Sequence, residues 1–477
     1  RSPAQSIRCR MSNQQRDPVQ KMREAGLSLA AVAAFERAYE FLKSGASADV
    51  PESAIAPVGE VPEYGELAAP DAGEGESLLA QSVVIKLNGG LGTGMGLDKA
   101  KSLLEVRDGM AFLDIIAQQV LAMRGAFGDG LRFLLMNSFS TSTDTLRYLE
   151  KYPELGSGDA VELLQNRVPK IDAESLLAVD WSANPELEWC PPGHGDLYPA
   201  LEGSGWLDRL LDDGVRYAFV SNSDNLGATL DLALLAHFAH SGAPFMMEVT
   251  ARTAADRKGG HLARSAGDGG LLLRESAQCP EADMDAFQDV GRHRFFNTNN
   301  LWLRLDALKE QLRDGGGVLP LPVIANRKTV DPRDGTSTPV IQLETAMGAA
   351  IECFEGALAV SVPRTRFAPV KTCDDLLALR SDAYVMTEDY RLELAPQRSG
   401  VPPVIELDKA HYKRADQLDA ALGGNVPSLL DCERLRVEGG VTFEPGTQFS
   451  GKVEVINAGA DPKPLASGAY ADGRVTL

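Results

Sequence analysis

Short apolar runs and amphipathic segments alternate along the middle of the chain, between about residues 81 and 385. The runs have the length of buried strands, and the segments between them repeat their apolar residues every three to four positions. Expected strands are residues 83–87, 131–136, 161–164, 217–220 and 357–362, and expected helices are residues 112–123, 140–149, 197–211, 344–354 and 374–384. This order predicts an α/β fold with a mixed, mostly parallel sheet and helices on both faces.

The pattern changes once within this middle part. Residues 245–250, 271–275 and 295–303 read as three strands in succession. Strands that follow one another without crossover helices favour antiparallel pairing. We therefore expect an antiparallel insertion beside the main sheet.

The two ends of the chain have patterns of their own. Residues 13–45 repeat apolar positions at helical spacing, and residues 50–80 are rich in proline, glycine and acid, as in a surface connector. After about residue 386, short valine-rich segments separated by glycines indicate the coils of a β-helix or a small sandwich. We expect three parts, at residues 1–80, 81–385 and 386–477.

Composition narrows the classes of function. A chain of 477 residues with 44% hydrophobic content can bury a large core. Its net charge of −20, without a clustered basic stripe, disfavours binding to nucleic acid or to an anionic membrane. No apolar run approaches the roughly 18 residues needed for a membrane span. An anionic substrate would need local lysines, arginines or a metal ion.

The six cysteines are scattered, without a C-x-x-C pair. This spacing argues against a disulfide scaffold or a zinc site and favours a reducing compartment, so we expect a cytoplasmic protein. Residues 1–10 contain no acid and precede the first methionine, Met11. They fit a transit-peptide remnant, upstream untranslated sequence or a cloning remnant, so import into an organelle stays open.

A glycine-rich loop follows the first strand of the middle part. Gly89, Gly90, Gly92, Gly94 and Gly96 come directly after the strand, and two lysines lie downstream. Glycines let backbone N–H groups approach a ligand closely, which suits a nucleoside triphosphate. The spacing fits neither a Walker phosphate loop nor a dinucleotide fingerprint. The alternative is a flexible glycine-rich connection.

Several motifs resemble one known family. KLNGGLGTGMG and AKSLLEV in the loop region are followed, in family order, by motifs that cover most of residues 80–385: PPGHGD (191–196), SNSDNLGAT (221–229), KGGHLAR (258–264), FFNTNNLW (295–302), QLETAMGAAI (342–351) and RFAPVKT (366–372). Together they resemble the UTP–glucose-1-phosphate uridylyltransferases. The resemblance implies a Rossmann-like (GT-A-like) nucleotidyltransferase core at 81–385 and a left-handed β-helix at 386–477.

The resemblance also implies the reaction. UTP and glucose 1-phosphate would give UDP-glucose and pyrophosphate, reversibly, by direct in-line attack with Mg²⁺ as cofactor. The loop carries Thr93-Gly94-Met95 where many sugar nucleotidyltransferases have arginine, and Ala100 where many have proline. These differences fit a eukaryotic-type branch of the family. The alternatives are a broad-specificity UDP-sugar pyrophosphorylase and a catalytically silent nucleotide-sugar-binding protein. Self-association through the C-terminal part is a further expectation.

Asp224 is the candidate metal ligand. It follows an apolar strand, and ligands bind open α/β sheets at the carboxyl ends of strands. A hard carboxylate there suits Mg²⁺, but it could equally cap the next helix. Only the resemblance favours the metal and UTP role.

Lys101 and Lys371 are the candidate catalytic cations, although a lone lysine is usually a solvated surface residue. Gln165 ends a strand, and its amide can both donate to and accept from a uracil edge. By resemblance, both lysines also bind UTP, and the base is held by Gln165 together with Leu87, Asn88, Gly89, Gly90 and Gly193.

His194 lies between two glycines after two prolines, an accessible position unlike that of a core histidine. The alternative is a turn histidine without a role. By resemblance it binds the sugar phosphate, and the remaining sugar-binding candidates are Asn222, Gly260, Glu275, Asn297 and Asn299. His237 and His240 read as structural or surface residues, and His261 stays undecided.

Overall fold

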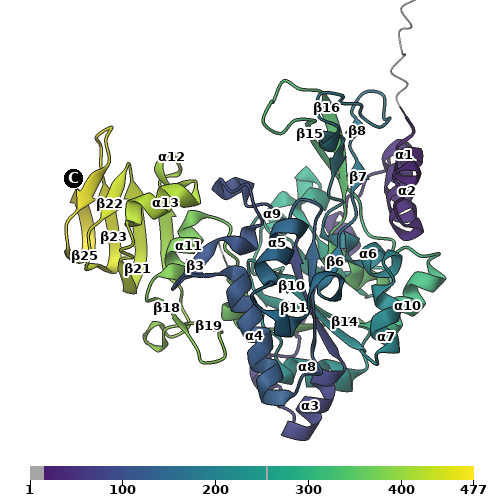
Figure 1. Cartoon of the computed structure of the whole chain (residues 1–477), viewed down its shortest axis with the longest axis horizontal. Helices are drawn as coiled ribbons and strands as arrows, with labels where there is room; N and C mark the ends of the chain where they lie inside the picture. The colour runs from purple at the N-terminus through teal and green to yellow at the C-terminus, as the bar shows by residue number, and fades with distance from the viewer. Residues whose placement is uncertain (1–15, 254–255) are drawn as a thin grey trace, which may run out of the picture.

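The computed structural model describes residues 16–253 and 256–477, so the ambiguous segment 1–10 lies outside the described residues. A central α/β core carries a stack of C-terminal strands on one side (Figure 1). A small sheet projects from another side of the core and is built from β8 (Ile171–Asp172), β15 (Ile324–Thr329) and β16 (Pro339–Glu344).

The core is organised around one ten-stranded mixed sheet with the order β1-β12-β14-β10-β2-β5-β6; β11 pairs with β14 and β17, and β13 pairs with β12. Its strands are β1 (Ile55–Pro57), β2 (Ser82–Asn88), β5 (Arg132–Asn137), β6 (Glu162–Leu164), β10 (Tyr217–Asn222), β11 (Phe245–Ala251), β12 (His261–Ser265), β13 (Leu271–Arg274), β14 (Phe295–Arg304) and β17 (Leu358–Ser361).

The central strands β10, β2, β5 and β6 are parallel neighbours. Helices cover both faces, so β2 is buried almost throughout, with Val84 in one core and Val83 and Ile85 in the other. The helices are α3 (Ala72–Ala80), α4 (Phe112–Phe127) and α8 (Leu232–Ser241) on the first face, and α6 (Leu197–Gly203), α7 (Trp206–Asp212) and α10 (Leu305–Asp314) on the second. The predicted α/β fold with a mostly parallel central sheet is confirmed.

The predicted separate antiparallel insertion is wrong in one respect. The strands are antiparallel, but they belong to the main sheet. β14 pairs with β10 through its C-terminal half, with β12 at Phe296, and with β11 along most of its length. A ten-residue strand offers both edges to partners that lie far apart in sequence, which a local pattern does not reveal.

Several predicted helices have different limits. The helix expected over 13–45 is two helices, α1 (Pro18–Glu24) and α2 (Leu29–Ser44), because Asp17 and Ser28 each cap a separate start. Residues 344–354 complete β16 and then form a 3₁₀ helix at Met347–Cys353, and residues 374–384 form α11 (Cys373–Arg380) before β18 (Tyr384–Met386) begins. The connector at 50–80 contributes β1 and α3.

The remaining short elements connect these layers. They are β3 (Glu105–Arg107), β4 (Met110–Ala111), α5 (Ser142–Leu149), β7 (Val168–Pro169), β9 (Trp189–Cys190), α9 (Met284–Phe287) and β19 (Leu392–Leu394). β18 pairs with β19 across the expected limit at 385/386. The three-part division of the chain stays a prediction.

The C-terminal part is built from parallel strands. Its larger sheet has the order β20 (Val404–Leu407), β21 (Ser428–Glu438), β23 (Thr447–Ile456) and β25 (Gly468–Thr476); its smaller sheet joins β22 (Val441–Phe443) to β24 (Lys463–Leu465). Helices α12 (Lys409–Tyr412) and α13 (Ala415–Leu422) pack beside them. Valines at 437, 453 and 455 stack inside, as the valine-rich pattern predicts.

Two further findings concern the described residues. None of their helices has the length and apolar character required to cross a membrane. All five of their cysteines are free.

Candidate active site

The glycine loop begins where β2 ends and packs against the predicted base reader. A Cβ added at Gly89 would lie 2.7 Å from Gln165 Oε1, so glycine lets the amide approach the backbone. At Gly90, no atom of the described residues lies within 4 Å of such a Cβ, and the Gly90 carbonyl oxygen accepts the Lys101 backbone N–H at 3.2 Å. The loop is therefore tight at its first glycine and open at its second.

Three predicted site residues meet where β2 and β10 end. The ammonium groups of Lys101 and Lys371 each lie 2.8 Å from the same oxygen, Oδ2 of Asp224. Lys101 also donates to the Val370 carbonyl oxygen. The capping alternative for Asp224 is excluded, because α8 starts at Leu232 and Asp231 is its N-cap.

The electrostatics of this triad follow from burial and charge. Burial alone would raise the pKa of Asp224, but the charges of Lys371 and Lys101 outweigh it and hold the pKa below its ordinary value. The second oxygen, Oδ1, is buried and has no hydrogen-bond partner among residues 16–253 and 256–477. Asp224 is therefore ionised at neutral pH and has one oxygen free for a further cation.

The Asp224 carboxylate fits a Mg²⁺ ion that is held mainly by water and substrate phosphates, rather than one surrounded by protein side chains. No group of three or more histidine, cysteine, aspartate or glutamate side chains capable of holding a metal occurs within residues 16–253 and 256–477. Mg²⁺ commonly takes one or two carboxylates and completes its shell with water and substrate phosphates. The unpaired Oδ1 of Asp224 matches that requirement.

The predicted base reader is joined to the PPGHGD motif. Gln165 Nε2 donates to the Gly193 carbonyl oxygen at 2.8 Å. Asp196 accepts the Asn166 backbone N–H at 2.7 Å and the Asn166 side-chain amide at 3.1 and 3.2 Å. Burial of Asp196 raises its pKa to about 7, although the bonds from Asn166 oppose that rise. The two segments are thus fixed to each other.

His194 is held in one tautomer. The Met347 backbone N–H donates to its Nδ1 at 3.0 Å, so the proton of the neutral ring lies on Nε2. The residue keeps an accessible surface. The protein atoms packed around its ring lower the pKa of His194 below its ordinary value, and the charge of Lys371 lowers this pKa further. The side chain can therefore act as a neutral N–H donor.

The predicted sugar-binding residues lie at the end of β10 (Asn222), just before β12 (Gly260), just after β13 (Glu275) and within β14 (Asn297 and Asn299). Asn299 Nδ2 donates to Asn222 Oδ1 at 3.1 Å. A Cβ at Gly260 would lie 2.5 Å from the Glu275 carboxylate. The pairing of β14 with β11 shifts between Glu248, which pairs with Asn300, and Val249, which pairs with Asn297. Asn299 lies in this bulge and has a φ of 62°. Such bulges re-aim side chains beside active sites.

Comparison with known proteins decides the family. A family model described as UTP–glucose-1-phosphate uridylyltransferase matches residues 32–449. The chain belongs to this family.

Named relatives agree with this membership. A UTP–glucose-1-phosphate uridylyltransferase of Solanum tuberosum is 41% identical over 408 residues, which span 85% of this chain and 81% of the relative. A mutant UDP-glucose pyrophosphorylase of Leishmania major, solved in complex with UDP-glucose, is 48% identical with a TM-score of 0.91 and covers 96% of this chain and 98% of its own. A UDP-glucose phosphorylase structure of Trypanosoma brucei is 47% identical, with a TM-score of 0.87 and the same coverage.

Two predicted UTP-binding residues, Leu87 and Asn88, form hydrogen bonds with other residues of the chain. The Leu87 carbonyl oxygen accepts the Ser223 N–H at 3.0 Å. Asn88 donates its side-chain amide to Asn137 at 2.7 Å and to Thr145 at 3.0 Å. These hydrogen bonds hold the end of β2 in place, and the glycine loop starts directly after it.

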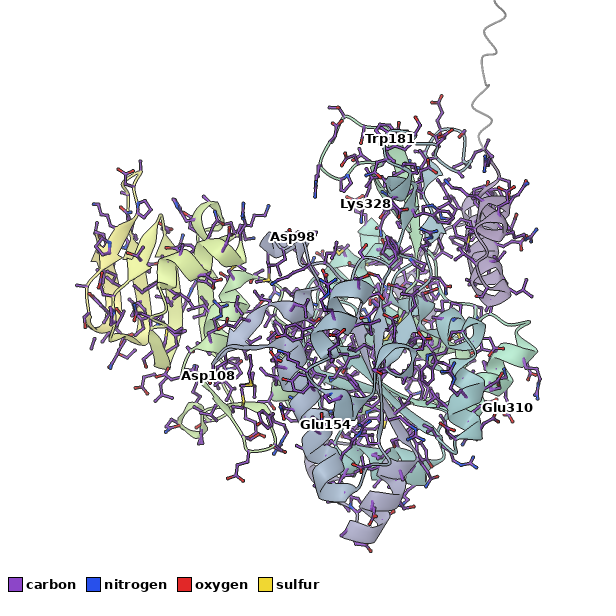
Figure 2. All side chains as sticks on the ribbon, viewed as in Figure 1. Asp98, Asp108, Glu154, Trp181, Glu310 and Lys328 are labelled. Atoms are coloured by element: carbon purple, nitrogen blue, oxygen red, sulfur yellow. The ribbon has the colours of Figure 1, made fainter. Side chains whose placement is uncertain are left out.

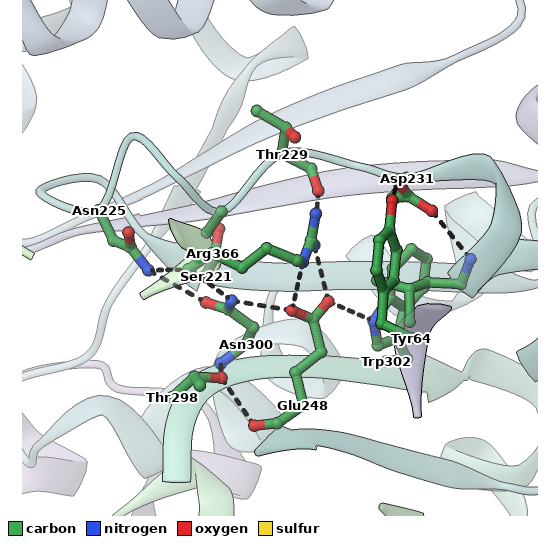
Figure 3. A network of polar contacts seen from close by, with 12 residues as sticks. Tyr64, Ser221, Asn225, Thr229, Asp231, Glu248, Thr298, Asn300, Trp302 and Arg366 are labelled. Carbon is green, nitrogen blue, oxygen red and sulfur yellow. Dashed lines mark hydrogen bonds and ion pairs between the residues drawn. The ribbon is translucent and has the colours of Figure 1, made fainter. Parts of the chain in front are cut away.

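Sequence reasoning missed a buried network beside the site (Figure 3). Glu248, fully buried in β11, accepts two hydrogen bonds from Arg366, each 2.8 Å, and further bonds from Asn300 and Trp302 at 3.0 and 2.9 Å. A signal was present, because a glutamate within the apolar run FMMEV needs a buried cation as partner.

Two other features of this uridylyltransferase-family chain were not foreseen. Arg414 of the C-terminal part contacts Gly96 of the glycine loop, where a Cβ would lie 2.8 Å from Arg414 Cγ. Figure 2 marks Asp98, two residues beyond Gly96, on the side of the core toward the C-terminal strands. A cavity of about 610 Å³ lies behind the Glu248 network, beside α4 and α8, and none of the predicted substrate residues lines it.

Proposed function

We propose that the chain catalyses the reversible transfer of uridylyl from UTP to glucose 1-phosphate, which gives UDP-glucose and pyrophosphate. The observation that carries the proposal is the Lys101–Asp224–Lys371 triad at the carboxyl ends of β2 and β10, in a chain of this family. Two polyanions must meet at that point, and two ammonium groups beside one carboxylate supply local positive charge despite the net charge of −20.

The chemistry needs no covalent enzyme intermediate. A phosphate oxygen of glucose 1-phosphate attacks the α-phosphorus of UTP, and pyrophosphate leaves in line. Lys101 and Lys371 neutralise charge as it develops, and positioning contributes the remainder of the catalysis. Bound Mg²⁺, held by Asp224 through Oδ1, would neutralise phosphate charge as a Lewis acid.

His194 serves as a hydrogen-bond donor rather than as a base. Its Nδ1 accepts the Met347 N–H, and Nε2–H is left to donate to the sugar phosphate. Because its pKa is lowered, the ring stays neutral at pH 7 and adds no charge of its own. Asn222, Gly260, Glu275, Asn297 and Asn299 would bind the hexose hydroxyls.

Gln165 would read the uracil edge, with Gly89, Gly90 and Gly193 lying against the base. Its Nε2 is already fixed by Gly193, so the amide cannot flip without losing that bond. A fixed amide accepts one base edge and leaves unpaired polar groups against another. This supports a preference for UTP over CTP.

The finer features of the fold are proposals as well. We propose a GT-A-like core and a left-handed β-helix at the C-terminus, supported by parallel pairing within two adjacent small sheets. The last strand, β25, is mostly exposed and offers an edge for self-association. To test the association, light scattering measures the molar mass of the full chain and of a variant with a proline in β25.

The decisive experiment is a pyrophosphate-release assay with Mg²⁺ over several sugar 1-phosphates. Turnover of UTP with glucose 1-phosphate, and little with galactose 1-phosphate, is the expected result. Comparable rates with both sugars would identify a broad-specificity UDP-sugar pyrophosphorylase. Binding of UDP-glucose without turnover would identify a silent binding protein.

A further inference from the structure

Asn225 lies beside the triad and uses its whole side-chain amide to join two loops. It follows Asp224, is 1% exposed, and bridges to Pro369 as an isolated β-pair. Its Nδ2 donates to the Arg366 carbonyl oxygen at 3.1 Å, and its Oδ1 accepts the Ala368 N–H at 3.1 Å. One amide thus fixes the segment 366–370, which leads directly into Lys371.

The backbone continues this connection up to the triad. The Val370 N–H donates to the Asp224 carbonyl oxygen at 3.0 Å. The Val370 carbonyl oxygen accepts from the Lys101 ammonium group. The segment therefore sets the position of the Lys371 backbone and of the Lys101 ammonium group.

The far end of the segment is anchored in the core. Arg366 is 7% exposed, forms a two-bond ion pair with Glu248, and donates to the Thr229 carbonyl oxygen at 2.9 Å. Asn300 joins the same group, because its Nδ2 lies 3.2 Å from the Arg366 carbonyl oxygen and its Oδ1 lies 3.4 Å from Asn225 Nδ2. Figure 3 shows Asn225 and Asn300 side by side next to Arg366.

We propose that Asn225 is a positioning residue, which sets the place of Lys371 and Lys101 relative to Asp224 and touches no reacting atom. The proposal rests on the uridylyl-transfer function. The two lysines share one oxygen at the same distance of 2.8 Å, so a small shift of the 366–370 segment would separate them from it. Charge stabilisation at a transition state depends steeply on such placement.

A purely structural asparagine of the same kind is present far from the site. Asn457, in the C-terminal part, is 4% exposed and donates to the Gly440 and Asp461 carbonyl oxygens at 2.7 and 2.8 Å. Its Oδ1 accepts the Gly459 N–H at 3.0 Å. Both asparagines are buried and bond backbone groups through donor and acceptor alike, so Asn457→Ala is a matched control for Asn225→Ala.

The test measures Tm, kcat and KM for UTP in the full-length chain. We expect both alanine variants to lower Tm by similar amounts. Asn225→Ala should also reduce kcat about 10- to 100-fold with KM for UTP within about 3-fold of wild type, whereas Asn457→Ala keeps both parameters. An equal kcat loss in the two variants, or none in Asn225→Ala, would overturn the proposal. Should Asn225→Ala fail to fold, Asn225→Ser and Asn457→Ser give the same comparison.

A double-mutant cycle with Lys371→Ala identifies the route of the effect. If Asn225 acts by placing Lys371, Asn225→Ala should cost kcat much less in the Lys371→Ala background than in wild type. Full additivity of the two losses would refute positioning through Lys371. An inactive wild-type chain would instead refute the proposed function, so the two failures are distinguishable.

Discussion

Asp224 and Glu248 are both buried carboxylates paired with cations, yet they differ in how many of their oxygens are hydrogen-bonded. Glu248 has both oxygens occupied by Arg366, Asn300 and Trp302. Asp224 has two lysines on one oxygen, and no hydrogen-bond partner for the other lies in the described part of the chain. The Lys371 side chain is 58% exposed, whereas that of Arg366 is 8% exposed.

We interpret the difference as one between a structural ion pair and the proposed catalytic one. A buried charge whose every oxygen is bonded has no capacity left for a ligand, and removal of its partner is costly. A carboxylate with a free buried oxygen and one solvent-exposed lysine partner, Lys371, can exchange that partner for a metal or a phosphate. In this chain, the incomplete hydrogen bonding of Asp224 is what distinguishes it from Glu248 as a candidate ligand-binding carboxylate.

The largest effect should come from Asp224→Asn. The amide cannot supply the negative charge that Mg²⁺ needs, so we expect turnover to fall about 10³-fold or more with the fold intact by circular dichroism. Asp231→Asn, the same change at the neighbouring helix cap, should retain most activity. Wild-type-like turnover of Asp224→Asn at ordinary Mg²⁺ would remove the metal role.

Lys101→Ala and Lys371→Ala should each lower kcat about 10²-fold, more than they raise KM for glucose 1-phosphate. The reason is that charge neutralisation matters most when charge develops at the transition state. Steady-state kinetics measure both parameters. The exposed Lys99 provides the control, since Lys99→Ala should leave kcat unchanged. A change in KM alone would make that lysine a substrate-binding residue only.

Glu248→Gln addresses the other side of the comparison. It leaves the Arg366 guanidinium buried without its counter-charge, so we expect a loss of about 3 kcal/mol in the free energy of unfolding, measured by urea denaturation. Asp224→Asn should lose clearly less, because the Lys371 side chain is 58% exposed and can be solvated by water. Equal losses of unfolding free energy in the two variants would show that the difference in hydrogen bonding between Glu248 and Asp224 does not affect stability.

Gln165→Ala tests a neutral polar group in the same site. Deletion of the fixed amide should reduce the preference for UTP over CTP by about 1–3 kcal/mol without abolishing turnover of UTP. Competition assays with both nucleotides give the ratio. If the ratio is unchanged, Gln165 only ends a strand.

Asp196 is a third buried carboxylate, bonded by amides but by no cation among the described residues, and its pKa is raised to about 7. Between the unfolded value of 3.8 and about 7, the folded chain holds a proton that the unfolded chain has lost. Stability should therefore fall as pH rises through that window, by about 1–2 kcal/mol from pH 5 to pH 7. Asp196→Asn should lack this slope in urea denaturation at each pH.

Periodicity predicted the repeating strands and helices well, because apolar spacing is a local property. Strands β2, β5, β6 and β10 lie where the pattern places them. It failed at residues 344–354, where a run with apolar character forms the end of β16 and a 3₁₀ helix. There, Glu344 pairs with Ile324 of the neighbouring strand, so the start of the run belongs to a sheet that local spacing does not reveal.

The sequence alone indicated the family and the parallel centre of the sheet, and it predicted which residues lie near the substrates, because motifs and strand ends are local. Only the tertiary structure decided that Lys101 and Lys371 share one oxygen of Asp224, and that Asp231 caps the next helix instead. It also decided that Glu248, Arg366 and Asn225 form one network. Apart from the local Asp231 cap, these contacts join residues more than 100 positions apart. Their geometry depends on how the whole sheet brings β10, β11 and the 366–371 segment together.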